Sequence, residues 1–122
     1  LYIKPDILQL REFTLKKDID IIEVFTSETA SGNSDYRVRV FAPKFGYLED
    51  PATGSGNSAF GYYLLKNKLC DGLQPLSLEQ NSDKINFNVV KLMTQKDLKN
   101  NLKVFFGGKG ILRIDGKYIL YP

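Results

Sequence analysis

Hydrophobic and polar positions alternate along much of the chain with the period of two that is typical of β-strands. In the segment from 36 to 43, Val38 and Val40 fall on one face of the expected strand. Arg37 and Arg39 fall on the other, and Pro43 ends the strand because proline has no N–H to donate. From this alternation and from runs of β-branched residues we expect strands at 19–26, 36–43, 75–80, 84–93 and 102–108.

One long helix and one short helix are expected between these strands. Residues 55–69 carry apolar side chains around most of the helical circumference, which predicts a largely buried helix. Gly72 is placed to adopt the left-handed conformation that ends it. A shorter helix begins at Pro5, which suits the first turn. The polar segments 27–35 and 94–101 are expected to be loops.

The end of the chain carries a strong hairpin signal. Asp115 and Gly116 stand between two apolar runs in residues 110–122, and both turn positions of such a hairpin require positive φ. Six or seven strands and one buried helix predict an α+β domain in which a mixed, curled β-sheet wraps around one central helix.

Composition and charge exclude several classes of function. The 122 residues are 43% hydrophobic and 25% charged, which fits one soluble globular domain spanning 1–122. The 17 Lys and Arg residues are scattered instead of forming a basic stripe, so we expect no nucleic-acid partner. No apolar run reaches the ~18 residues of a membrane span, and no signal peptide opens the chain, so we expect no membrane partner and a cytoplasmic location. The pattern that starts at Leu1 is typical of the middle of a domain, and we expect a piece of a longer protein.

The residue types present limit the possible chemistry. The chain has no histidine, which excludes Ser-His-Asp and Cys-His nucleophiles and removes the commonest metal ligand. Its single cysteine, Cys70, is expected to be a buried and inert thiol. Carboxylates, hydroxyls and backbone groups remain, and we expect neither a metal nor a cofactor.

The segment EDPATGSGNSAFGYY, residues 49–63, admits three interpretations. In the first, Asp50 or Thr53 caps the helix, which leaves Gly54 and Gly56 unexplained, each costing up to ~1 kcal/mol relative to Ala. In the second, these glycines belong to the dinucleotide fingerprint G-x-G-x-x-A, with Glu79 as the acidic residue that follows about twenty positions later. The loop that precedes the glycines, and later strands joined by hairpins and not by crossovers, argue against this fingerprint.

The third interpretation is an anion site at the start of the helix. Without side chains in the way, a carboxylate or phosphate reaches the unpaired N–H groups of Gly54, Ser55 and Gly56. Asp50 next to this site suits a proton-transfer group, and Thr53 directs its hydroxyl to the same place.

This segment resembles the signature of the phenazine-biosynthesis (PhzF-like) isomerase family, and the likeness covers nearly the whole chain. The signature residues are Arg39, Phe41, Pro43, Gly46, Glu49, Asp50, Pro51, Ala52, Thr53, Gly54 and Ser55. One departure is Asn81, which stands after Glu79 and Gln80 where the family usually has glycine.

The resemblance implies a diaminopimelate-epimerase-like fold of two similar domains, of which this chain is the second. The expected partners are then the N-terminal half of the same protein, a small carboxylate substrate bound in the cleft between the halves, and a second copy in a homodimer. The family's principal acid/base glutamate belongs to the missing half, so the chain alone is expected to be inactive. Asp50 is expected to assist in catalysis, and Thr53, Gly54, Ser55 and Gly56 to bind substrate.

Related epimerases carry a catalytic cysteine in place of Thr53, and a hydroxyl is too weak an acid for that role. A proton shift or allylic isomerisation is therefore expected. The alternative is a non-catalytic module that binds a small anion or associates with itself.

Overall fold

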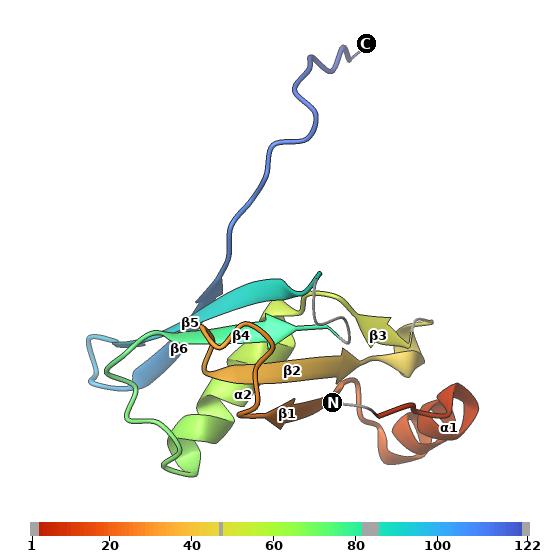
Figure 1. Cartoon of the computed structure of the whole chain (residues 1–122), viewed down its shortest axis with the longest axis horizontal. Helices are drawn as coiled ribbons and strands as arrows, with labels where there is room; N and C mark the ends of the chain where they lie inside the picture. Colours follow the sequence, from red (N-terminus) through yellow and green to blue (C-terminus); the bar gives the residue numbers. More distant parts are fainter. Residues whose placement is uncertain (1–2, 47, 82–85, 121–122) are drawn as a thin grey trace.

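The computed structural model describes residues 3–46, 48–81 and 86–120, which form an α+β fold (Figure 1). Its elements in chain order are α1 (Ile7–Lys17), β1 (Ile22–Thr26), β2 (Tyr36–Phe41), the 3-10 helix η1 (Pro43–Phe45), β3 (Glu49–Asp50), α2 (Gly54–Lys66), β4 (Leu76–Gln80), β5 (Asn88–Lys96) and β6 (Leu102–Gly107). The strands form one sheet in the order β1-β2-β4-β5-β6, and β3 pairs with β2. Because β2 and β4 are parallel and the other pairs antiparallel, the sheet is mixed, and the predicted α+β class with a mixed, curled sheet is confirmed.

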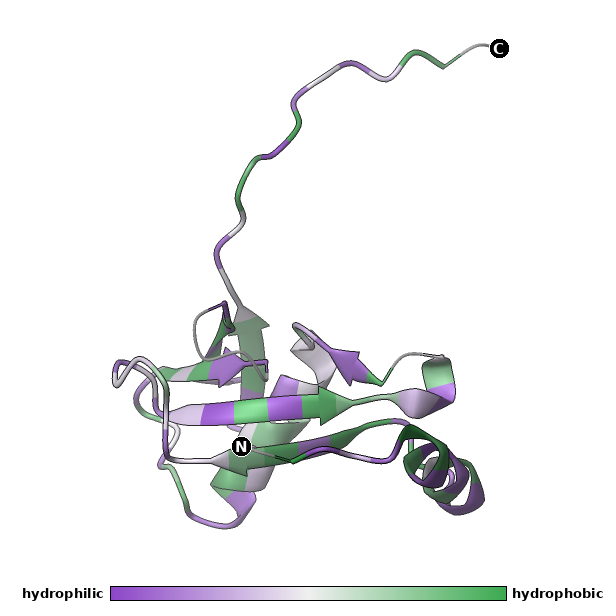
Figure 2. Ribbon diagram, turned by 45° about the vertical axis from the view of Figure 1, so that its right-hand side comes forward, coloured by the Kyte–Doolittle hydropathy of each residue, from purple (hydrophilic) through white to green (hydrophobic). Residues whose placement is uncertain are grey.

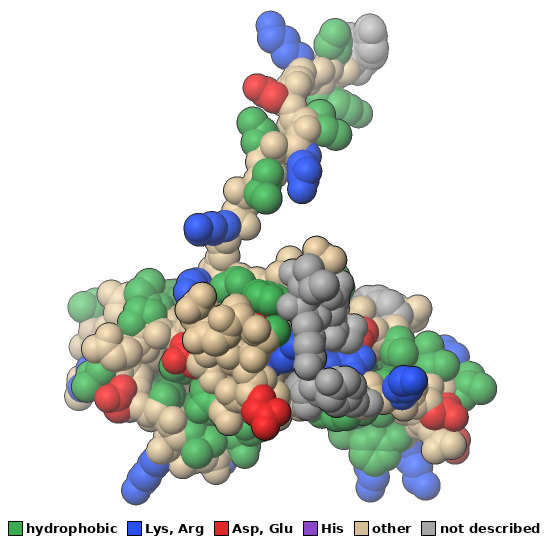
Figure 3. Space-filling model, viewed as in Figure 1, with side chains coloured by type: hydrophobic (Ala, Val, Ile, Leu, Met, Phe, Trp, Pro, Cys, Tyr) green, Lys and Arg blue, Asp and Glu red, His purple; other side chains and the backbone are tan. Residues whose placement is uncertain are grey.

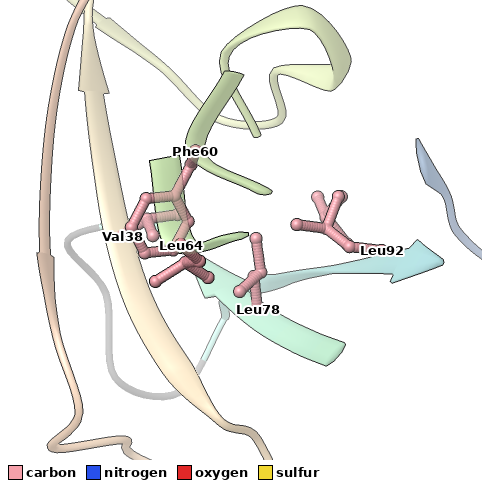
Figure 4. Packing of buried hydrophobic residues seen from close by; sticks show 6 residues of the cluster. Val38, Phe60, Leu64, Leu78 and Leu92 are labelled. Carbon is pink, nitrogen blue, oxygen red and sulfur yellow. The ribbon is translucent and has the colours of Figure 1, made fainter. Parts of the chain in front are cut away.

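The core lies between α2 and one face of the sheet (Figure 4). Its buried members are Val38, Phe60, Leu64, Leu78, Val90 and Leu92. A Cβ at Gly61 would stand 2.7 Å from Val104, so this glycine lets α2 approach β6 closely. The expectation that α2 is buried around most of its circumference is wrong: Tyr62 and Tyr63 are 44% and 47% exposed, because the sheet covers only one side of the helix.

On β2 and β4 the opposite face of the sheet carries mostly polar side chains and is also buried. The alternation predicted for β2 is visible along the strand (Figure 2). Nevertheless both faces of β2 are buried, since Arg37 is 2% exposed and donates from Nη2 to the carbonyl of Asn81 at 3.1 Å. Glu79 on β4 ties the 27–35 loop down by accepting hydrogen bonds from the N–H groups of Ala30 and Ser31, at 2.6 and 3.0 Å. Burial raises the pKa of this carboxyl, but these bonds, the Ser31 hydroxyl and the charge of Arg37 outweigh it and hold the pKa below its ordinary value.

Several predicted boundaries shift in the structure. Residues 94–96, expected in a loop, continue β5, and the turn follows at 97–101. Residues 84 and 85 of the predicted strand lie outside the described residues. Pro5 precedes α1 and is not part of it, because Asp6 is the N-cap and accepts the N–H of Leu8 at 2.9 Å. Gly72 has φ +73, as predicted, but it does not end the helix, because α2 stops at Lys66 with Asn67 as its C-cap.

The predicted hairpin at Asp115 and Gly116 is wrong. Residues 108–120 form no strand, and they lead away from the sheet (Figures 1 and 3). Gly116 does not adopt positive φ. The apolar side chains of this segment, for example Ile114 and Tyr118 at 88% and 89%, are exposed. A two-stranded hairpin is marginal unless further strands or a helix pack on it, and no described element does so here.

Candidate functional site

An ion pair between two residues of the signature places Asp50. The guanidinium of Arg39 binds both carboxylate oxygens of Glu49, with Nε at 2.9 Å from Oε1 and Nη2 at 2.7 Å from Oε2. The arginine side chain is only 7% exposed. A bidentate pair of this kind fixes both position and orientation, so it holds the two-residue strand β3 on β2. Because neighbouring side chains alternate, Asp50 then points to the face on which α2 begins.

The carboxylate of Asp50 is hydrogen-bonded to Thr53. The Thr53 hydroxyl donates to Oδ2 at 2.7 Å, and the N–H of Ala52 donates to Oδ1 at 3.3 Å. Thr53 is the N-cap of α2, yet its side chain makes no capping hydrogen bond. The capping interpretation of the segment therefore lacks its defining contact. Among the described residues, no side chain accepts the N–H groups of Gly54, Ser55 and Gly56 at the start of α2.

Gln80 organises this loop, and sequence analysis missed it. Its Oε1 accepts the N–H of Thr53 at 2.9 Å and the side-chain amide of Asn57 at 2.7 Å. Its Nε2 donates to the carbonyl of Asp50 at 2.7 Å and to the Thr53 hydroxyl at 3.0 Å. Gln80 and Asn57 are both 0% exposed. The end of β4 thus joins the end of β3 to the first turn of α2 through one buried amide.

The two glycines at the start of α2 admit close protein neighbours. A Cβ at Gly54 would lie 2.2 Å from the ring of Phe106, and one at Gly56 would lie 3.1 Å from a carboxylate oxygen of Glu23. Packing therefore accounts for both glycines, in addition to any access for an anion. Gly54 is partly buried, Ser55 is exposed and Gly56 is buried, so the N–H groups within reach belong to the first two. Thr53 is 6% exposed, and its hydroxyl is engaged with Asp50 and Gln80.

Two hollows flank the start of α2. One of about 1010 Å³ is lined by Ala52 and Gly54 together with residues of β5 and β6. The other, of about 440 Å³, lies beside β1 and is lined by Ser55, Gly56 and Glu23 among others. Asp50 lines neither of these two hollows.

Glu23 is the second carboxyl group on this face of the sheet. It pairs with Val40 on β2, and Val40 pairs in turn with Asp50 on β3. The strands that carry the two acids are therefore two sheet spacings apart, about 10 Å. Burial raises the pKa of Glu23 to about 7.

The dinucleotide interpretation fails at Glu79. This carboxyl is 0% exposed and is held by Ala30 and Ser31. It cannot reach a ribose bound at the start of α2. The chain does contain one crossover that sequence analysis did not expect, since β2 and β4 are parallel and α2 lies between them in the chain.

Comparison with known proteins identifies relatives of this chain. The model of the family described as phenazine biosynthesis-like protein matches residues 2–116. An uncharacterized isomerase of Vibrio cholerae serotype O1 is 37% identical over 75 residues, which are 62% of this chain and 25% of that protein. A 1.76 Å crystal structure of a Clostridium difficile (strain 630) protein assigned to phenazine biosynthesis PhzC/PhzF superposes with a TM-score of 0.58 at 25% identity. The superposed region is 93% of this chain and 40% of the Clostridium difficile protein. This chain therefore spans less than half the length of these relatives.

Within the described residues, no helix has the length and apolar character needed to cross a membrane.

Proposed function

The chain belongs to the phenazine biosynthesis-like protein family, and on this basis we propose that it supplies one wall of the active site of a cofactor-independent isomerase. The substrate is a small molecule that carries a carboxylate. The observation that carries this proposal is the start of α2. There the N–H groups of Gly54 and Ser55, four and five residues after Asp50, have no capping side chain among the described residues.

The carboxylate of the substrate binds at these N–H groups. Helix N–H groups and the helix dipole together attract an anion, by ~0.3 to 1 kcal/mol from the dipole at an exposed site and about 2 where the site is partly buried. The same groups stabilise negative charge that develops on the substrate when a proton leaves a neighbouring carbon. Gly54 and Ser55 therefore position the substrate by binding its carboxylate.

Asp50 moves the proton. The hydroxyl of Thr53 donates to Oδ2 and so orients the carboxylate, while the amide of Ala52 contacts Oδ1 only weakly, at 3.3 Å. Oδ1 therefore keeps most of its capacity to accept a proton from carbon and return it to another position. The second acid/base group, by the resemblance to the family, is a glutamate of the other half, and the cleft closes when both halves are present.

The test compares Asp50→Asn with wild type in a protein that contains this chain and its other half. Asparagine keeps an acceptor for the Thr53 hydroxyl but cannot carry a proton, and Asp115→Asn in the exposed tail is the matched control. Isomerisation of an accepted carboxylate in D₂O, followed by NMR, should fall by roughly 10² to 10⁴ in Asp50→Asn only. The unfolding free energy should change by less than about 1 kcal/mol. Unchanged turnover, or equal losses of stability and turnover, would refute the proposal.

A second candidate function is a non-catalytic module that associates with itself. Exposed apolar residues of the tail favour it, among them Ile111, Leu112 and Leu120 at 73%, 79% and 80%. Exposed apolar side chains that come together in a patch mark interaction sites. Two measurements distinguish the candidates. In light scattering of the 122-residue chain, a module of this type is a stable dimer at all concentrations tested. When joined to the other half, it still lacks turnover.

A further inference from the structure

The hollow on the β1 side of α2 is lined by Glu23, an acid with one buried oxygen that no described residue contacts by a hydrogen bond. Oε1 of Glu23 is buried and accepts no hydrogen bond from the described residues. No lysine or arginine lines the hollow. A carboxylate oxygen that is removed from water without a donor destabilises a fold, and a ligand with a donor would relieve this.

Aromatic rings line the same hollow, Phe25 from β1 and Phe60 and Tyr63 from α2. Phe25 and Phe60 pack with ring centroids 4.7 Å apart, and Phe60 and Tyr63 lie nearly parallel at 6.3 Å. Phe25 and Tyr63 are 38% and 47% exposed, so their surfaces are open to a ligand. Ile21 and Ala59 complete the apolar lining. The volume of about 440 Å³ is within the range of small-molecule sites.

An acid and several aromatic rings around one hollow are complementary to a cation on an apolar body. The acid supplies charge and an acceptor, and aromatic faces attract ammonium groups. We propose that the hollow beside Glu23 is a binding site for an ammonium group carried on a small apolar molecule. This inference goes beyond the proposed isomerase, because it concerns binding in the hollow that Asp50 does not line and requires no turnover.

The charged and titratable groups around Glu23 do not compete for this role. Tyr63 and Ser55 line the hollow from α2. On the sheet, Val40 separates Glu23 from Asp50, whose carboxylate is bound to Thr53. Arg39 points to the opposite face, where it is paired with Glu49. The ionisation of Glu23 should therefore control the affinity for a cation.

The test is an NMR titration of the ¹⁵N-labelled chain with 2-phenylethylammonium, which stays charged between pH 6 and pH 8. We expect saturable shifts of the amides of Phe25 and Ala59. A carboxyl with a pKa of about 7 is mostly protonated at pH 6 and mostly ionised at pH 8. Binding should therefore be roughly tenfold tighter at pH 8. The neutral analogue 2-phenylethanol should bind more weakly at pH 8 and with no pH dependence.

Two variants complete the design. Glu23→Gln has the same shape without the charge, and it should weaken binding of the amine at pH 8 at least tenfold and abolish the pH dependence. Glu28→Gln removes an exposed acid from the loop that follows the same strand and should change neither. If Glu23→Gln does not fold, the comparison of amine with alcohol in the wild type decides alone. Absent or non-saturable shifts, equal binding of the alcohol at pH 8, or unchanged binding in Glu23→Gln would overturn the proposal. Each of these results leaves the turnover test of Asp50 unaffected.

Discussion

Replacement of Gln80 by leucine tests whether one buried amide holds the candidate site together. Leucine fills nearly the same volume but removes the four hydrogen bonds to Thr53, Asn57 and Asp50. Each such bond contributes about 0.5 to 1.5 kcal/mol net, which amounts to roughly 2 to 6 kcal/mol. The apolar surface of leucine offsets part of this loss, and we expect a destabilisation of about 3 kcal/mol.

Urea unfolding followed by circular dichroism measures this loss. With a slope of about 2 kcal/mol per M, the midpoint should fall by roughly 1.5 M. Gln95→Leu on the exposed side of β5 is the control and should change the unfolding free energy by less than about 0.5 kcal/mol. The amide resonances of Gly54 and Ser55 should shift in Gln80→Leu only. A midpoint within error of the wild type would show that the amide does not organise the loop.

Three further predictions concern the carboxyl groups. Glu49→Gln removes the negative charge and the bidentate geometry of the pair with Arg39, whose side chain is only 7% exposed, so thermal unfolding should show a loss of about 3 kcal/mol. No loss would mean that β3 is held otherwise. Glu79 has a lowered pKa in the folded state, so its stabilisation is present above the unfolded value of about 4.3 and is lost as the pH falls below it; Glu79→Gln should reduce this acid sensitivity in urea titrations at pH 7 and pH 3. Glu23 has a raised pKa in the folded state, so its ionisation destabilises the fold as the pH rises from about 4.5 towards 7. Glu23→Gln should therefore raise the unfolding free energy by about 2 to 3 kcal/mol at pH 8 and leave it unchanged at pH 4.

Local patterns in the sequence located the segments of the site but not the contacts that organise them. The alternation in β2 and the helical pattern of α2 were sufficient to predict an α+β fold, since both follow from side chains close in sequence. Gln80 lies 27 residues from Thr53, and nothing in its own neighbourhood indicates that it hydrogen-bonds the loop. The ring of Phe106 that rests on Gly54 is equally remote in sequence. Only the parallel pairing of β2 with β4 and the packing of β6 on α2 bring these residues together.

In residues 108–120 a strong local pattern predicted a hairpin that the structure does not contain. Asp115 and Gly116 have the chemistry of a tight turn, but no described strand or helix packs against residues 108–120. Asn81 shows how a family pattern acquires a physical reason from the structure. It has φ +130, a conformation that favours glycine, which is the residue the family usually has at this position.

A titration of the ¹⁵N-labelled chain with benzoate tests the central claim most directly, because it observes the N–H groups at the start of α2. We predict saturable shifts of the Gly54 and Ser55 amides with benzoate and none with benzyl alcohol, which has no charge. An anion site at this helix would be contradicted if both compounds shifted the two amides equally. It would also be contradicted if benzoate shifted neither amide.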